Sequence, residues 1–102
     1  MDVTVTDAPD QKRYEARVDG ELAAFVDYIP TGELIAFTHT EVLPAFEGKG
    51  IGAQLVKGAL EDVRGSRRSV LAVCPFVSGY LQRHPGEYGD LVYRSRTGAV
   101  RD

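Results

Sequence analysis

Three glycines at alternate positions, Gly48, Gly50 and Gly52, lie between a predicted strand and a predicted helix. The first N–H groups of a helix have no intrahelical acceptor and sit at the positive end of its dipole, so they bind a phosphate where no Cβ blocks its approach. Glycine leaves that approach open because it has no Cβ. The spacing therefore predicts an anion site, and the alternative is a glycine-rich turn that only begins a helix.

Two common phosphate-binding motifs do not fit this loop. In a Walker A motif the lysine is followed by Ser or Thr, whereas Lys49 is followed by Gly50 and precedes the helix. The dinucleotide fingerprint needs Gly-x-Gly-x-x-Gly and a different strand order. The loop alone thus leaves the class of anion open.

The only cysteine, Cys74, stands between an apolar run and Pro75. Proline suits the first turn of a helix, so amide N–H groups and the helix dipole should lie beside the thiol and favour a thiolate. A lone cysteine at the end of an apolar strand is equally typical of a small buried hydrophobe. A single cysteine forms no internal disulfide, and with two histidines no Cys/His zinc site is expected.

Two ionisable residues alternate onto one face of a predicted strand. They are His39 and Glu41, and either could act as a proton acceptor. A hydrogen-bonded packing histidine and a solvated carboxylate are the alternatives. Tyr80 could donate a proton, although it is, like Phe25 and Phe37, typical of a core residue.

The early part of the chain predicts a meander. Three segments rich in β-branched and aromatic residues are separated by short turns: residues 14–18, 22–29 and 34–42. This pattern is typical of antiparallel strands. Residues 3–6 could add a frayed edge strand.

The periodicity changes after Gly50. An apolar stripe over residues 51–64 predicts an amphipathic helix that ends near Gly65. Gly58 within it costs about 1 kcal/mol relative to alanine, and we expect close packing on the sheet to account for it.

The last third predicts a strand, a helix and a final short strand. The apolar run of residues 69–74 is expected to be a strand covered on both faces and, through a strand–helix–strand crossover, parallel to residues 34–42. Apolar residues at helical spacing follow from Pro75 until Pro85-Gly86 stops the run. Residues 91–93 could form one more strand. The expected fold is α+β, in the order β-β-β-loop-α-β-α-(β).

Length and composition predict one domain over residues 1–102, since the chain has the size of a single core. Residues 1–47 hold ten acidic and three basic side chains, and residues 48–102 hold nine basic and five acidic ones. The split suggests an anionic ligand in the second half, while the net charge of -3 argues against nucleic acid as a partner.

No run approaches the roughly 20 apolar residues of a membrane span, and no signal peptide is visible, so we expect a cytoplasmic protein without a membrane partner.

Several motifs recur together in one order. They are His39-Thr40-Glu41-Val42, the loop of residues 48–52, Cys74-Pro75-Phe76-Val77, Tyr80, Arg83-His84-Pro85 and Tyr88-x-Asp90-Leu91-Val92. This set resembles the GNAT superfamily (GCN5-related N-acetyltransferase-like), in particular a small single-domain branch with a Cys-Pro-Phe-Val motif. The loop is similar to the GNAT pyrophosphate loop, Arg/Gln-x-x-Gly-x-Gly/Ala, except that Glu47 occupies the Arg/Gln position. Backbone amides, helped by Lys49, would then have to hold the anion.

The resemblance implies a mixed sheet in which one parallel pair of strands is split at a cleft for acetyl-CoA or coenzyme A. The backbone of residues 40–43 would pair with the pantetheine arm. The implied cofactor-binding residues are Val42, Leu43, Gly48, Lys49, Gly50, Ile51, Gly52, Ala53, Ser78 and Arg83. No metal site is implied.

The implied reaction is acetyl transfer to a primary amine of a small molecule or a protein. In direct transfer, Glu41 or His39 would deprotonate the amine, and Tyr80 or Tyr88 would protonate the departing sulfur. In a covalent route, Cys74 would accept the acetyl group first. The helical arm that most GNAT proteins carry between their first strands is absent, so the acceptor site should be shallow and open. The alternative is a coenzyme A-binding module without turnover, favoured by the acidic residue in the loop.

Overall fold

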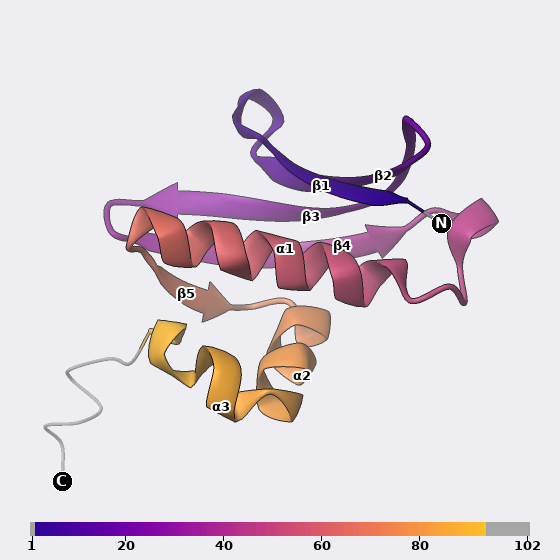
Figure 1. The fold of residues 1–102 in the computed structure, drawn as a ribbon. Helices are drawn as coiled ribbons and strands as arrows, with labels where there is room; N and C mark the ends of the chain where they lie inside the picture. The colour runs from indigo at the N-terminus through magenta and orange to yellow at the C-terminus, as the bar shows by residue number, and fades with distance from the viewer. Residues whose placement is uncertain (1, 94–102) are drawn as a thin grey trace, which may run out of the picture.

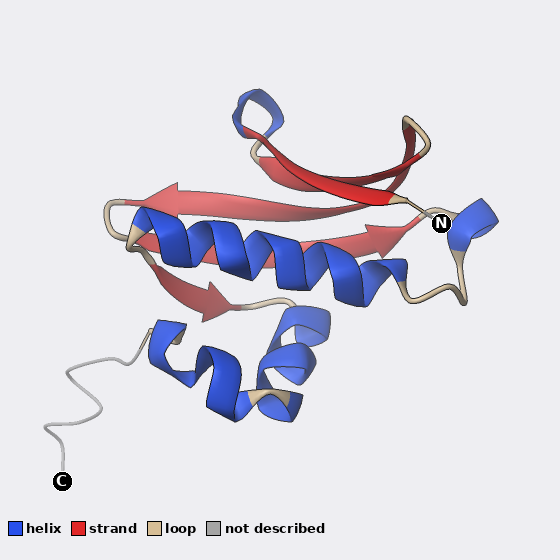
Figure 2. Cartoon of the chain, viewed as in Figure 1, coloured by secondary structure: helices blue, strands red, loops and turns tan. Residues whose placement is uncertain are grey.

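The computed structural model describes residues 2–93, in which five strands form one mixed sheet in the order β1-β2-β3-β4-β5 (Figures 1 and 2). The strands are β1 (Val3–Ala8), β2 (Arg13–Val18), β3 (Glu21–Thr31), β4 (Leu34–Val42) and β5 (Ser69–Ala72). Neighbouring strands are antiparallel from β1 to β4, and β5 runs parallel to β4. The α+β class, the meander and the parallel pair predicted from the sequence are confirmed.

One long helix covers the sheet. Helix α1 (Ile51–Ser66) packs against all five strands through its apolar stripe, whereas α2 (Pro75–Arg83) and the short α3 (Pro85–Tyr88) lie beside β5 (Figure 1). Three single turns of 3-10 helix complete the fold: Pro9–Gln11, Pro44–Phe46 and Gly89–Leu91. None of the helices within residues 2–93 has the length and apolarity that a bilayer crossing demands.

Three buried tyrosines anchor the core to carboxylates at its margin. Each phenolic oxygen donates one hydrogen bond: Tyr14 to Asp62 (2.6 Å), Tyr28 to Asp7 (2.6 Å) and Tyr88 to Glu61 (2.7 Å). Burial raises the pKa of all three phenols, and the hydrogen bond to a negative carboxylate raises it further. The hydroxyls therefore stay protonated and satisfied inside the fold.

The strand β5 is shorter and more exposed than predicted. It ends at Ala72, and although Val70 is fully buried, Leu71 and Val73 are 39% and 59% exposed. Successive side chains of a strand point to opposite faces, and α1 covers only one face of the sheet. The prediction that this strand is covered on both faces was therefore wrong.

The predicted ends of two later elements also differ from the structure. Residues 91–93 form no strand; Val92 makes one parallel bridge to Val70 after a single 3-10 turn. Helix α1 continues through Gly65 and stops where Arg67 adopts a left-handed conformation (φ 62°). Pro85 ends the preceding helical run, as predicted, but it also begins α3.

The close packing expected at Gly58 is confirmed and gives a testable result. A Cβ on Gly58 would lie 2.8 Å from Cβ of Val5 in β1, inside van der Waals contact. Although alanine is the better helix former, we expect Gly58→Ala to lower the free energy of unfolding by about 1–2 kcal/mol in urea titrations, because the clash outweighs propensity. Gly65→Ala is the matched control, since its Cβ would meet nothing within 4 Å, and it should raise stability by about 0.5–1 kcal/mol.

If Gly58→Ala is as stabilising as Gly65→Ala, the contact between α1 and β1 is not close. The double variant Gly58→Ala/Val5→Ala should recover only part of the loss, because it removes the two γ-carbons that the new Cβ would meet and keeps the Cβ of residue 5, which lies 2.8 Å away.

Candidate active site

The strands β4 and β5 pair over only the first half of β4. Their parallel register joins residues 34–37 to residues 69–72. The carbonyl oxygen of Phe37 then accepts hydrogen bonds from both Val73 N–H (3.0 Å) and Cys74 N–H (2.9 Å), and the chain turns into α2. Within residues 2–93, no strand pairs with the β5 side of residues 38–42. The two strands therefore diverge, with Cys74 beside the point where they part.

Successive N–H groups of β4 point alternately toward β3 and toward this split. Leu43 N–H donates to the carbonyl of Ala23 in β3, and Thr40 N–H donates to the sulfur of Cys74. Since the N–H groups of alternate residues in a strand point to the same side, the N–H of Val42 points in the same direction as that of Thr40. Pantetheine pairing, expected for residues 40–43, thus fits Val42, whereas Leu43 already uses its N–H within the sheet.

A cavity of about 270 Å³ lies where β4 ends and α1 begins. It is lined by Val42, Phe46, Glu47, Gly48, Gly50, Ile51, Gly52, Ala53 and Phe76. Gly48 and Gly50 have positive φ values of 78° and 74°, and a Cβ at either position would extend into open space. No side chain caps the N-terminus of α1. The first amides of the helix are therefore left without a side-chain partner at this cavity.

The third glycine of the loop has a different role. A Cβ on Gly52 would lie 2.8 Å from Cζ of Phe76 and 3.3 Å from Cγ2 of Val42. Glycine here lets the Phe76 ring, from the second residue of α2, pack against the start of α1. Phe76 lines the cavity although no periodicity in the sequence predicts it; its place next to Pro75 in the Cys-Pro-Phe-Val motif was the available signal.

Of the two charged residues in the loop, only the acidic one lines the cavity. Glu47 lines it, and Lys49, although exposed in the same loop, does not. An anion in this cavity would therefore meet main-chain donors together with one carboxylate. That backbone amides do most of the binding stays a prediction.

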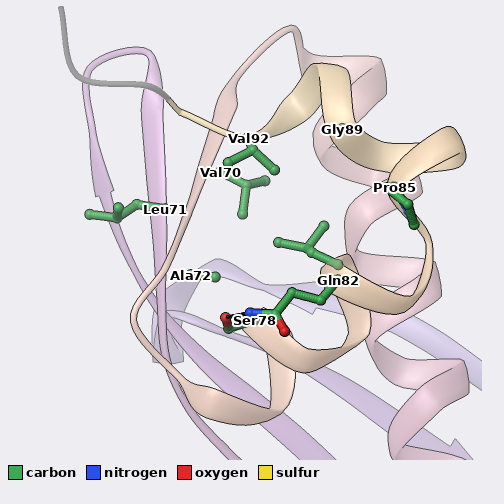
Figure 3. Close-up of a pocket in the computed structure, with 9 residues that line it drawn as sticks. Val70, Leu71, Ala72, Ser78, Gln82, Pro85, Gly89 and Val92 are labelled. Atoms are coloured by element: carbon green, nitrogen blue, oxygen red, sulfur yellow. Dashed lines mark hydrogen bonds between the residues drawn. The ribbon is translucent and has the colours of Figure 1, made fainter. Parts of the chain in front are cut away.

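Two further predicted cofactor residues lie elsewhere. Ser78 lines a separate groove of about 370 Å³ bounded by β5, α2 and the segment after α2 (Figure 3), and its hydroxyl accepts a hydrogen bond from Gln82. Arg83 is exposed in the last turn of α2 and lines neither cavity. The structure does not bring either residue to the loop cavity.

The thiol of Cys74 is buried in a set of hydrogen-bond donors. The residue is 4% exposed and immediately precedes α2, with Pro75 at the first helical position, as predicted. Burial raises the pKa of the thiol, but hydrogen bonds from the Thr40 hydroxyl and from the N–H groups of Val77, Phe76 and Thr40 outweigh it, so the pKa is below its usual value. The surroundings therefore favour the thiolate at a lower pH than for a free cysteine.

His39 and Glu41 share a face, as predicted, but it is the face opposite Cys74. Their side chains are 58% and 51% exposed and approach each other to 3.2 Å (Nε2 to Oε1). Thr40, which contacts the sulfur, pairs with Val26 on the side covered by α1. The cause is a β-bulge: Thr38 has no partner on β3, and this extra residue reverses the alternation after Phe37.

The predicted proton donors belong to the core. Tyr80 is buried, stacks on His84 (ring centroids 4.2 Å apart), and has a pKa raised by burial and by the nearby charges of Glu87 and Glu61. Tyr88 already donates its hydroxyl to Glu61. Tyr80 thus stays protonated within α2, whereas the hydroxyl of Tyr88 is bound to Glu61 of α1.

A family described as GCN5-related N-acetyl-transferase matches residues 13–91. No curated protein sequence gives a significant match. Among solved structures, a GCN5-like protein of Staphylococcus aureus superposes with a TM-score of 0.66 at 19% identity, over 97% of this chain and 96% of that one.

Two larger proteins share the fold over part of their length. A GNAT family acetyltransferase of Brucella melitensis, solved with acetyl-CoA, gives a TM-score of 0.58 at 24% identity, covering 71% of this chain and 50% of that one. The ribosomal-protein-S18-alanine N-acetyltransferase of Escherichia coli gives 0.59 at 14% identity, covering 72% and 50%. The aligned part is thus half of each of those proteins.

Proposed function

The chain belongs to the GCN5-related N-acetyltransferase (GNAT) family, and from this premise we propose that it transfers an acetyl group from acetyl-CoA to a primary amine. The observation that carries the proposal is the position of the loop cavity. It opens at the uncapped N-terminus of α1 and continues along Val42 toward the split between β4 and β5.

The residues present fit coenzyme A at this place. Main-chain amides at the start of α1 would hold the pyrophosphate, because Gly48 and Gly50 leave its approach open. The backbone of Val42 would pair with the pantetheine arm, and Phe76 would form a wall beside it. The thioester would then arrive near Cys74, where the strands part.

In the covalent route, the Cys74 thiolate attacks the thioester carbonyl carbon. A new carbon–sulfur bond forms to Cys74, the bond to the coenzyme sulfur breaks, and that sulfur leaves as a thiolate that takes a proton. The amine then attacks the acetyl-cysteine, loses its proton and returns the Cys74 thiolate. We propose this route because the hydrogen-bond donors around Cys74 stabilise its thiolate, which is the form that attacks.

Direct transfer is the second route. The pair His39–Glu41 would accept the proton of an amine that approaches from the face of the sheet opposite α1. That face is open at the pair, since both side chains are more than half exposed. A binding module without turnover is the remaining alternative, and the carboxylate of Glu47 in the cavity favours it.

The proposal is tested by binding and turnover measured on the full chain. Calorimetry should give one site for coenzyme A and for acetyl-CoA, and mass spectrometry should find acetylated products when acetyl-CoA is mixed with small amines and peptides. Binding without acetylated product or acetyl-CoA hydrolysis would leave the binding module. The absence of any binding would overturn both.

A further inference from the structure

Four donors surround one sulfur at the split of the sheet. The hydroxyl oxygen of Thr40 lies 3.3 Å from Sγ of Cys74, and the main-chain N–H groups of Val77, Phe76 and Thr40 are close enough to lower the pKa of the thiol. A protonated thiol would need an acceptor for its own hydrogen, and only the Thr40 hydroxyl among these four groups can accept one. A thiolate accepts from all four. The arrangement is therefore complementary to the negative sulfur.

The Thr40 side chain is the one member of this set that mutation can remove cleanly. Its N–H and those of Phe76 and Val77 belong to the main chain and persist in any variant. The hydroxyl is held in place because Thr40 pairs with Val26 on the covered face of the sheet, which aims its side chain at Cys74 rather than at solvent.

We propose that Thr40 is a positioning residue for Cys74, whose hydroxyl donates to the sulfur and keeps it poised as a nucleophile. The inference rests on the proposed role of Cys74 in acetyl transfer. The thiol proton goes to solvent when the thiolate forms, so no further group is required.

Other ionisable groups on the neighbouring elements do not explain the state of the sulfur. His39 and Glu41 flank Thr40 on β4 but project from the opposite face. On α2, the buried Tyr80 stacks on His84. The groups that lower the pKa of Cys74 are neutral donors, and Thr40 is the first of them.

The test follows thiolate formation directly. In Thr40→Val, which keeps the β-branched shape and removes the hydroxyl, the pH midpoint of iodoacetamide alkylation should move upward, and the rate at neutral pH should fall about tenfold. Thr40→Ser should restore the wild-type midpoint because it keeps the donor. Because Cys74 is the only cysteine, the alkylation reports on this site alone.

The matched control is Thr38→Val. Thr38 lies two residues earlier in β4 and donates its hydroxyl to the carbonyl of Asp27, not to the sulfur. The midpoint of Cys74 alkylation should therefore not change in this variant. Thermal unfolding of each variant checks that the fold is kept, and Thr40→Ala is a second variant without the hydroxyl should Thr40→Val not fold. A wild-type midpoint in a folded variant that lacks the hydroxyl would overturn the inference.

The outcomes for Thr40 and for the proposed function are separable. Acetylation of Cys74 by acetyl-CoA is measured in the wild-type protein by mass spectrometry. A raised midpoint in Thr40→Val without any acetyl-Cys74 supports the role of Thr40 and removes the covalent route. An unchanged midpoint with acetyl-Cys74 present removes the role of Thr40 and leaves the covalent route in place.

Discussion

Cys74→Ser should bind coenzyme A with wild-type affinity and lose at least about a hundredfold in acetyl transfer. A serine hydroxyl is a far weaker nucleophile than a thiolate at neutral pH, and the neighbouring donors do not supply a base to deprotonate it. Binding should persist because Cys74 does not line the loop cavity. Steady-state acetylation of an amine and calorimetry with coenzyme A measure the two quantities separately.

Two further measurements define the covalent route. The wild-type chain should gain one acetyl group on Cys74 in a rapid-mixing experiment with acetyl-CoA, and Cys74→Ala should gain none. Unchanged turnover in Cys74→Ser would leave direct transfer as the surviving route. In that case Glu41→Gln, which removes the carboxylate next to His39, should be the variant that loses activity.

Gly50→Asp should abolish coenzyme A binding. The change places a Cβ and a negative charge at the N-cap of α1, in the cavity where the pyrophosphate is proposed to lie. Repulsion between like charges a few ångströms apart outweighs what main-chain amides contribute. Calorimetry should show no heat of binding, and a wild-type affinity would remove the loop from the proposed site.

The controls separate charge from backbone strain. Gly50 has a φ of 74°, where asparagine and aspartate are tolerated at a cost of about 1–2 kcal/mol relative to glycine. Gly50→Asn has nearly the same shape as Gly50→Asp without its charge, so it should weaken binding less. Glu47→Gln removes a negative charge from the same cavity and should strengthen binding, most clearly at low ionic strength.

Much of the fold could be predicted from the sequence because local signals and packing agree. The meander, the amphipathic helix over residues 51–64 and the helix begun by Pro75 all depend on periodicity and turn residues that act over short distances. The errors lie at the edge of the sheet. Whether Leu71 is covered depends on which elements pack on a face, and the residues of the strand alone do not determine that.

The candidate site is likewise divided between features that consecutive residues predict and features that depend on strand pairing. The loop glycines and the junction at Cys74 follow from sequence because they are consecutive positions at the start of a helix. The face taken by His39 and Glu41 depends instead on the bulge at Thr38, which is a property of the pairing between two strands. An uninterrupted alternation from Phe37 would have put both side chains on the covered face.

The three tyrosine–carboxylate pairs set an alkaline limit for this protein. In an unfolded chain these phenols would ionise near pH 10, whereas in the fold they remain protonated. Their contribution to stability is therefore complete below pH 10, and above it folding loses about 1.4 kcal/mol per tyrosine for each pH unit. Acetyl transfer requires the free base of an amine, which alkaline solution supplies. The alkaline pH that deprotonates an amine therefore also begins to destabilise the fold.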